Sequence, residues 1–138
     1  MNISVIGSTG SIGTQTLEIA RAHDINVIAL TAGKNVKLLA SQAREFRAKR
    51  AVIAEEKLFG ELKLALADTD IKAEAGAGAI AEAAAIKVDR VVNASVGIAG
   101  LLPTEAAIKA CNDVALANKE TLVAGGEYIM GLIRGSGV

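Results

Sequence analysis

A glycine-rich segment close to the N-terminus has the residue types and the spacing of a phosphate-binding turn. It follows a β-branched run, precedes a helical pattern and reads Gly7-Ser8-Thr9-Gly10-Ser11-Ile12-Gly13. Gly7 would let the chain turn sharply off the strand, Gly10 would let the backbone approach a pyrophosphate, and Gly13 would let the helix pack close to the sheet. The helix N-terminus would offer free N–H groups, and the hydroxyls of Ser8, Thr9 and Ser11 would add donors. The segment therefore predicts a dinucleotide site.

The spacing of these glycines is G-x-x-G-x-x-G rather than the more familiar G-x-G-x-x-G. A glycine-rich strand-to-helix turn without a ligand is the alternative to a binding site. The segment stands directly after a predicted strand and at the start of a predicted helix, and this context favours the dinucleotide site.

The second strand-to-helix turn bears on which nicotinamide cofactor the site would take. An NAD site usually places Asp or Glu at the end of the second strand, where it accepts a hydrogen bond from the ribose 2′-hydroxyl. Here the turn has no acid and reads Leu30-Thr31-Ala32-Gly33-Lys34-Asn35. Lys34 stands where a 2′-phosphate would lie, and an ammonium attracts that phosphate. The turn predicts a preference for NADPH, with a solvated loop lysine as the alternative.

Two further polar clusters lie at the predicted carboxyl ends of later strands, which is where open α/β sheets bind ligands. The loop from Asn93 to Gly100 contains glycine and could lie under the nicotinamide. After the next strand, Asn118-Lys119-Glu120 places an amide, a cation and a carboxylate in a row. The alternative for this triplet is capping of the following helix, because a Glu near a helix N-terminus suits the helix dipole.

Short β-branched runs alternate with longer helical patterns along the chain. Strands are expected at about residues 3–6, 26–30, 51–54, 71–75, 90–94 and 114–117. Helices are expected at about residues 12–22, 36–47, 58–66, 79–86, 103–110 and 121–130. This alternation implies right-handed crossovers and a parallel sheet covered on both faces. The predicted fold class is α/β, a three-layer, doubly wound parallel sheet of the Rossmann-like NAD(P)-binding type.

The composition bounds the remaining function classes. The 138 residues suit one domain, and with 51% hydrophobic but only 2% aromatic residues the core must consist of Ala, Val, Ile and Leu. Fifteen basic and fifteen acidic residues cancel, which leaves no electrostatic footprint for nucleic acid or an anionic membrane. The single Cys111 and the single His23 exclude a disulfide framework and a Cys- or His-rich metal site. Without a signal peptide or an apolar run of about 18 residues, we expect a cytoplasmic domain.

Four segments, in order, resemble the N-terminal domain of the 1-deoxy-D-xylulose 5-phosphate reductoisomerase family. They are GSTGSIGTQTL (7–17), AGKNV (32–36), VGIAGLLPT (96–104) and ALANKETLV (115–123). The resemblance implies an NADPH-dependent enzyme of the non-mevalonate isoprenoid pathway. Its family rearranges 1-deoxy-D-xylulose 5-phosphate and reduces the aldehyde intermediate to 2-C-methyl-D-erythritol 4-phosphate, with Mg²⁺ or Mn²⁺ holding the substrate oxygens.

The resemblance also implies roles for individual residues, carried over by matching position. The NADPH phosphates would be contacted by Thr9, Gly10, Ser11 and Ile12, and the adenosine ribose phosphate would be surrounded by Gly33, Lys34 and Asn35. Asn118 and Glu120 would lie by the nicotinamide half, and Lys119 would point towards the substrate.

The sequence departs from the family pattern towards its end. In this family the metal-binding carboxylates follow in an Asp-x-Glu-His segment of the next domain, and this chain stops before it; the phosphate-binding lid and the C-terminal helical domain are also missing. We expect residues 1–130 to form an NADPH-binding domain, excised or redesigned, with no metal site and little or no turnover. Residues 131–138 are expected to be an atypical Gly-rich tail that halts the helical pattern, a linker or an artificial junction.

Other classes of NAD(P)-binding protein fit the sequence less well. An extended short-chain dehydrogenase needs a Tyr with a Lys four residues later, but Tyr128 is followed by Leu132. A semialdehyde dehydrogenase needs a Cys nucleophile and a His base, whereas Cys111, expected as a small buried residue, and His23 fall on different elements. A rival of another class is a non-catalytic or designed scaffold that binds nucleotide weakly or self-associates. An open edge of the sheet predicts a homodimer or poor solubility.

Overall fold

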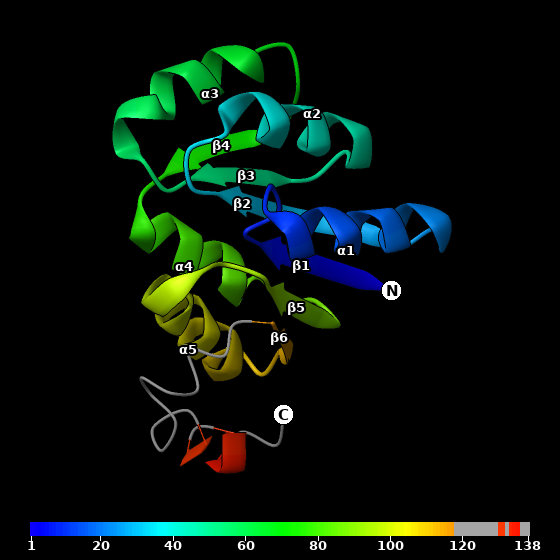
Figure 1. The fold of residues 1–138 in the computed structure, drawn as a ribbon, viewed down its shortest axis with the longest axis vertical. Coiled ribbons are helices and arrows are strands. Elements are labelled where there is room, and N and C mark those ends of the chain that lie inside the picture. The colour runs from blue at the N-terminus through cyan, green and yellow to red at the C-terminus, as the bar shows by residue number, and fades with distance from the viewer. Residues whose placement is uncertain (118–129, 132, 136–138) are drawn as a thin grey trace.

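The described part of the chain forms a six-stranded parallel sheet between layers of helices (Figure 1). The computed structural model describes residues 1–117, 130–131 and 133–135. The strand order is β4-β3-β2-β1-β5-β6, so the chain builds the sheet outward from β1 to β4 and then returns to the other side of β1. This reversal between the β1 and β5 halves opens a crevice at the carboxyl ends of the strands. The predicted α/β, doubly wound class is confirmed.

The expected elements are present as far as residue 117, and their ends differ from the prediction by at most two residues. The strands are β1 (Asn2–Ile6), β2 (Asn26–Ala32), β3 (Arg50–Ile53), β4 (Lys72–Ala75), β5 (Arg90–Asn93) and β6 (Asp113–Leu116). The helices are α1 (Ser11–Ala22), α2 (Val36–Phe46), α3 (Phe59–Ala65), α4 (Ala77–Ala85) and α5 (Leu101–Lys109). Two short 3-10 helices, η1 (Glu56–Leu58) and η2 (Gly97–Gly100), precede α3 and α5.

The strands are apolar because both faces of the sheet are covered. β1 has four consecutive buried residues and β2 is buried along most of its length, the pattern of central parallel strands. On one face α1, α2 and α3 contribute Leu17, Leu39 and Leu62 to a shared core, and α4 and α5 cover the other face. Within the described residues every buried hydrophobic side chain is Ala, Val, Ile or Leu, as the composition required.

Two details concern helix boundaries. Pro103 is the third residue of α5, in the first turn, where its missing N–H would have no helical partner in any case. Residues 130–131 and 133–135 are helical, although the Gly-rich tail was expected to halt the helical pattern. Glycine disfavours a helix by only about 1 kcal/mol relative to alanine, so it weakens a helix without forbidding it.

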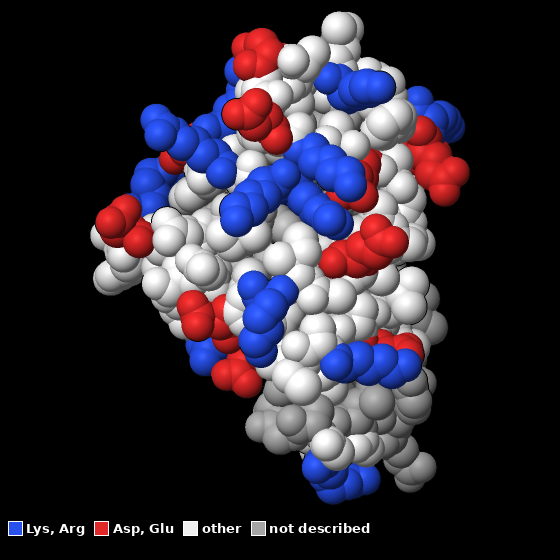
Figure 2. Space-filling model, turned by 180° about the vertical axis from the view of Figure 1, so that it is seen from behind, with Lys and Arg blue, Asp and Glu red and all other residues white. Residues whose placement is uncertain are grey.

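Charged side chains of both signs share the molecular surface. Figure 2 shows Lys and Arg interspersed with Asp and Glu over the face opposite to the view of Figure 1, as a net charge of zero would suggest. Among the described residues, no helix has the length and apolar character needed to cross a membrane.

Candidate functional site

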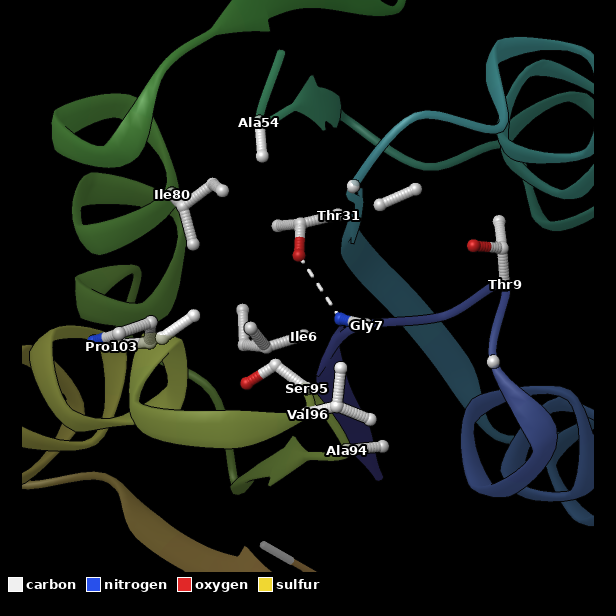
Figure 3. Close-up of a pocket in the computed structure, with 14 residues that line it drawn as sticks. Ile6, Gly7, Thr9, Thr31, Ala54, Ile80, Ala94, Ser95, Val96 and Pro103 are labelled. Atoms are coloured by element: carbon white, nitrogen blue, oxygen red, sulfur yellow. Dashed lines mark hydrogen bonds between the residues drawn. The ribbon is translucent and has the colours of Figure 1, made fainter. Parts of the chain in front are cut away.

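A pocket of about 250 Å³ lies at the carboxyl ends of the central strands, where a doubly wound sheet binds its ligands (Figure 3). Its walls come from the segments at the ends of β1, β2, β3 and β5, from η2, and from α4 and α5. The lining residues are Ile6, Gly7, Thr9, Gly10, Thr31, Ala32, Gly33, Ala54, Ile80, Ala94, Ser95, Val96, Ala99 and Pro103. None of them carries an ionisable side chain, so this described wall can hold a ligand but offers no acid or base.

Gly7 makes the turn out of β1 at the centre of the pocket (Figure 3). Its φ of +80° lies in the left-handed region, and a Cβ here would stand 2.7–2.9 Å from backbone atoms of Ala94 and Ser95. The Gly7 N–H donates to both the carbonyl and the hydroxyl oxygen of Thr31 at 3.1 Å, and the Ser8 N–H donates to the same carbonyl at 2.8 Å. The sharp turn predicted at Gly7 is confirmed, and it also brings the loops after β1 and β5 into direct contact.

The N-terminus of α1 adjoins the pocket through Gly10. The helix has no side-chain cap and no acidic residue in its first turn, so nothing there offsets the positive end of its dipole. By helix geometry, the N–H groups of Ser11, Ile12 and Gly13 have no partner within the helix. A Cβ on Gly10 would meet only the Gly7 carbonyl, at 3.8 Å, so the backbone is accessible, as its predicted pyrophosphate role requires. A Cβ on Gly13 would lie 2.2 Å from that carbonyl, so Gly13 allows close packing against the turn rather than the sheet.

Ser8 contributes its backbone to the turn, while its side chain faces the interior. The residue is fully buried, and its hydroxyl donates to Oε1 of Gln42 at 2.7 Å. Nε2 of Gln42 donates in return to the Ser8 carbonyl at 3.0 Å. The expectation that this hydroxyl donates to a phosphate does not fit the structure, because its hydrogen is already used inside the protein. Thr9 lines the pocket and Ser11 is exposed, so their hydroxyls are free to face a ligand.

The second turn places an ammonium beside the pocket on its β2 side. Gly33 lines the pocket and also borders a neighbouring shallow hollow of about 500 Å³, together with Lys34, Glu55 and Glu56. Lys34 is exposed, in accord with a residue available to a ligand. The side-chain oxygen of Asn35 caps α2 by accepting from the N–H three residues later at 3.1 Å. This cap explains why the chain turns into a helix directly after Lys34.

The loop after β5 is shaped from inside by Asn93, which is fully buried. Nδ2 of Asn93 donates to the Gly100 carbonyl at 2.8 Å and to the Thr104 hydroxyl at 2.7 Å. Its Oδ1 accepts from the Ser95 N–H at 3.2 Å and from the Ser95 hydroxyl at 2.6 Å. Val96, which follows on the pocket wall, has an 86% exposed side chain. The loop therefore presents Ala94, Val96 and Ala99, together with Ser95, to the space where a nicotinamide was expected.

Some predicted residues cannot be placed beside the pocket. Asn118, Lys119 and Glu120 lie outside the described residues. Cys111 is exposed rather than buried, because it lies in the left-handed turn, with φ of +60°, that follows α5. Within the described ranges, no three His, Cys, Asp or Glu side chains are grouped so that they could hold a metal ion. The residues present there do not fit a Mg²⁺ or Mn²⁺ centre.

Two residues that organise the site escaped the sequence prediction, namely Thr31 and Gln42. Both are buried polar residues within segments otherwise directed at the core, with exposed fractions of 2% and 6%. Gln42 stands three residues after Leu39, on the apolar stripe of α2, and a polar residue in such a stripe was the available signal. Its partner, Ser8, could not be deduced from spacing, since 34 residues separate them.

Nearly the whole chain resembles one family of known proteins. Residues 3–126 match the family model described as 1-deoxy-D-xylulose 5-phosphate reductoisomerase. The enzyme of that name from Lachnospira eligens is 51% identical over 135 residues, which cover 96% of this chain and 36% of the relative. The chloroplastic enzyme of Oryza sativa subsp. japonica is also 51% identical, over 94% of this chain and 28% of the relative. This chain thus spans about a third of the length of the curated relatives it matches.

Solved structures agree with this likeness. The reductoisomerase from Zymomonas mobilis in complex with NADPH superposes with a TM-score of 0.95 and 48% identity, over 99% of this chain and 36% of that one. A second reductoisomerase, in complex with NADPH, fosmidomycin and magnesium, gives a TM-score of 0.94 at 34% identity, over 99% of this chain and 35% of that one. Because both superpositions cover 99% of this chain, they extend beyond Met130 into residues 131–138, which the sequence analysis expected to be an atypical tail. The chain belongs to the 1-deoxy-D-xylulose 5-phosphate reductoisomerase family.

Proposed function

We propose that this chain is the NADPH-binding domain of a 1-deoxy-D-xylulose 5-phosphate reductoisomerase and that it binds NADPH without completing the reaction. The observation that carries the proposal is the start of α1. An uncapped helix N-terminus opens, through Gly10, onto a pocket at the reversal point of a doubly wound sheet. The NADPH complex of the Zymomonas mobilis relative, which has the same fold over this chain, supports it.

The cofactor would lie across the carboxyl ends of the strands. Its diphosphate would accept hydrogen bonds from the N–H groups of Ser11, Ile12 and Gly13, which lack helical partners. Its adenosine half would lie on the β2 side, and its nicotinamide half would lie over the loop after β5. Ser8 is fully buried with its polar groups paired inside the protein, so it is left out of the proposed contacts. The proposed contacts on the described part of the chain are Gly7, Thr9, Gly10, Ser11, Ile12, Gly13, Gly33, Lys34 and Asn35. Asn118 and Glu120 would lie at the nicotinamide end, and Lys119 would point towards the substrate.

Lys34 would supply the preference for the 2′-phosphate. The turn from β2 into α2 has no acid of its own, whereas Glu55 and Glu56 border the same hollow as Lys34. Because carboxylates repel a phosphate, attraction of the 2′-phosphate depends on the ammonium and on the backbone around Gly33. Removing the ammonium should therefore affect NADPH far more than NADH.

The complete reaction needs groups beyond this domain. The described pocket wall has no ionisable side chain, and the described residues contain no group of acids or histidines suited to a metal ion. In the proposed whole enzyme, other parts of the protein would hold the divalent metal and the substrate phosphate. This domain would contribute the hydride donor, oriented with its nicotinamide towards that substrate.

The test is calorimetric titration with NADPH, NADH and adenosine 2′,5′-bisphosphate, on the unmodified chain and on Lys34→Ala. We expect NADPH to bind more tightly than NADH, and Lys34→Ala to weaken NADPH roughly tenfold or more, since a hydrogen bond to a charged group contributes about 1.5–3 kcal/mol. NADH affinity should change much less. Mixing the chain with NADPH and 1-deoxy-D-xylulose 5-phosphate should give no NADPH oxidation above background.

Lys49→Ala is the matched control for the change in charge. Lys49 is exposed and precedes β3, at the end of the sheet opposite the pocket. Lys49→Ala changes the net charge by the same amount as Lys34→Ala. Because Lys49 is far from the pocket and its charge is screened by salt, its removal should leave the affinities for NADPH and NADH within about twofold. An unmodified chain that binds neither nucleotide at millimolar concentration would overturn the proposal and leave a scaffold without its own cofactor affinity.

A further inference from the structure

Gln42 is a buried amide whose hydrogen bonds reach a single residue of the glycine turn. It lies among the buried residues of α2, between Leu39 and Ala43 in sequence, and only 6% of its surface is exposed. Its Nε2 donates to the Ser8 carbonyl at 3.0 Å, and its Oε1 accepts from the Ser8 hydroxyl at 2.7 Å. Both bonds are buried, so breaking either one would leave a polar group without water.

The segment that carries Lys34 is held to the glycine turn on both of its sides. Before this segment, the Thr31 carbonyl accepts from the N–H groups of Gly7 and Ser8 at 3.1 and 2.8 Å. After it, Gln42 holds the carbonyl and the hydroxyl of Ser8. The glycine turn therefore cannot shift relative to the Lys34 segment without breaking buried hydrogen bonds.

NADPH would contact the glycine turn and the Lys34 segment at the same time. Its diphosphate and its 2′-phosphate are linked through one ribose, so their separation varies little compared with that of two independent anions. A protein that holds its two phosphate sites at a matching separation avoids the cost of ordering them when the ligand binds. A rigid link between the turn and the Lys34 segment would supply that preorganisation.

We propose that Gln42 is a positioning residue for NADPH binding. Gln42 does not touch the cofactor. It fixes the position of the backbone from Ser8 to Gly10 relative to Lys34, so that the diphosphate and the 2′-phosphate of one NADPH molecule can bind at the same time. The inference rests on the proposed function and deepens it, because it makes cofactor affinity depend on a buried amide of α2 outside the pocket wall.

The test is a double-mutant cycle between Gln42→Met and Lys34→Ala, measured as Kd for NADPH. Methionine keeps nearly the volume of glutamine but removes both hydrogen bonds to Ser8. Gln42→Met should weaken NADPH about tenfold, and Lys34→Ala should cost about tenfold in the unmodified chain but less than about threefold in the Gln42→Met background. Adding Ser8→Ala to Gln42→Met removes the hydroxyl that methionine leaves unpaired, and it should restore part of the lost stability without restoring affinity, since the Ser8 carbonyl still lacks its donor.

Asn112→Leu is the control for the loss of a buried amide. Asn112 is fully buried, its Nδ2 donates to the carbonyls of Ala84 and Ile86, and its Oδ1 accepts from the Val88 N–H, away from the pocket. This variant should lose stability but keep its NADPH affinity within about twofold when measured on folded protein. Circular dichroism of every variant, at the temperature of the titration, establishes that folded protein is compared.

The outcomes separate the two proposals. If the unmodified chain binds NADPH while Gln42→Met keeps its affinity, or if the effects of Gln42→Met and Lys34→Ala simply multiply, Gln42 is only structural and this inference is overturned. The proposed function then still stands. If the unmodified chain does not bind NADPH, both are overturned. Non-additive losses with Asn112→Leu unaffected in affinity would establish the positioning role.

Discussion

The carboxamide of Asn93 donates to the hydroxyl of Thr104 at 2.7 Å and so joins the last residue of β5 to the first turn of α5. That hydroxyl donates in turn to the Gly100 carbonyl at 2.8 Å, which the same carboxamide also reaches. These hydrogen bonds lie at the two ends of the loop after β5, and the backbone of this loop at Ala94 and Ser95 approaches Gly7 closely. The loops after β1 and β5 therefore lie against each other and form one wall of the pocket, although Gly7 and Ala94 are 87 residues apart in the sequence.

Replacing Thr104 by Val should loosen this arrangement. The substitution keeps the side-chain shape but removes the buried hydroxyl, so the free energy of unfolding should fall by about 1–2 kcal/mol. Urea denaturation followed by circular dichroism measures the change. Thr16→Val is the control, since its hydroxyl, which donates to the Ile12 carbonyl, is exposed and should matter by less than about 0.5 kcal/mol. Equal effects of the two substitutions would show that the Thr104 hydroxyl does not stabilise the loop after β5.

Gly10→Ala should separate binding from folding. Gly10 has φ of −79°, and the nearest atom to an added Cβ is 3.8 Å away. Alanine is a poorer N-cap than glycine but restricts the unfolded chain, so the two effects oppose each other and stability should change by less than about 1 kcal/mol. The same methyl group would cover the backbone that we propose the diphosphate approaches. NADPH affinity should fall roughly tenfold, equivalent to about 1.4 kcal/mol. Calorimetry and thermal unfolding of one sample give both quantities, and unchanged affinity would argue against a diphosphate at this helix start.

Gly7→Ala should behave in the opposite way and fail at the level of the fold. A side chain at φ of +80° is strained, and its Cβ would lie within 3 Å of Ser95 backbone atoms. We expect a loss of about 2 kcal/mol or more in the free energy of unfolding. Comparison with Gly10→Ala in the same denaturation experiment is decisive, because both changes add one methyl group. A Gly7→Ala protein as stable as the unmodified chain would show that the loop after β5 can retreat.

Acid should weaken the contact between α1 and α2. The hydrogen bond from Arg21 lowers the pKa of Glu45, so the folded state holds this proton less tightly than the unfolded state does. The resulting stability is present above the ordinary carboxyl range and is lost as the pH falls below about 4.5, through the lowered pKa. Glu45→Gln should therefore flatten the decline in stability between about pH 5 and pH 3.

Glu18→Gln is the control for the acid experiment, since it removes a carboxylate from α1 that does not make this hydrogen bond. Urea midpoints across the pH range, measured for both variants, give the slopes. Identical slopes for Glu45→Gln and the unmodified chain would show that the pair does not couple folding to pH. The effect should shrink at high salt, because both side chains are partly exposed.

Self-association through an open sheet edge stays a prediction. β4 is an edge strand of the described sheet, only four residues long, and it carries Lys72 and Glu74. Short, charged edge strands resist pairing with a second copy. Lys72→Val should therefore increase any dimer formed through this edge, measured by light scattering over a range of concentrations. A monomeric mass for both proteins at every concentration would contradict pairing through β4.

The fold followed from local patterns because the signals for its elements are local. The β-branched run before Gly7 and the apolar spacing around Leu39 needed no knowledge of distant residues. The glycine turn was also found from spacing alone, and the structure gives Gly7 the steric role expected of it, whereas Gly13 packs against the turn rather than against the sheet. The prediction that the Ser8 hydroxyl donates to a phosphate was wrong because the local sequence around a loop serine does not show whether its hydroxyl faces a ligand or a buried amide.

The sequence by itself determined the alternation of strands and helices, the apolar character of the core and the position of the glycine turn. Each of these depends on neighbours a few positions away. Only the tertiary structure decided which distant residues meet. The backbone of Ser95 packs against Gly7, Gln42 is hydrogen-bonded to Ser8, and the buried side chain of Asn93 is hydrogen-bonded to the loop after β5. Those contacts join segments brought together by the packing of the whole sheet, and buried hydrogen bonds of this kind are chosen by geometry in space rather than by spacing along the chain.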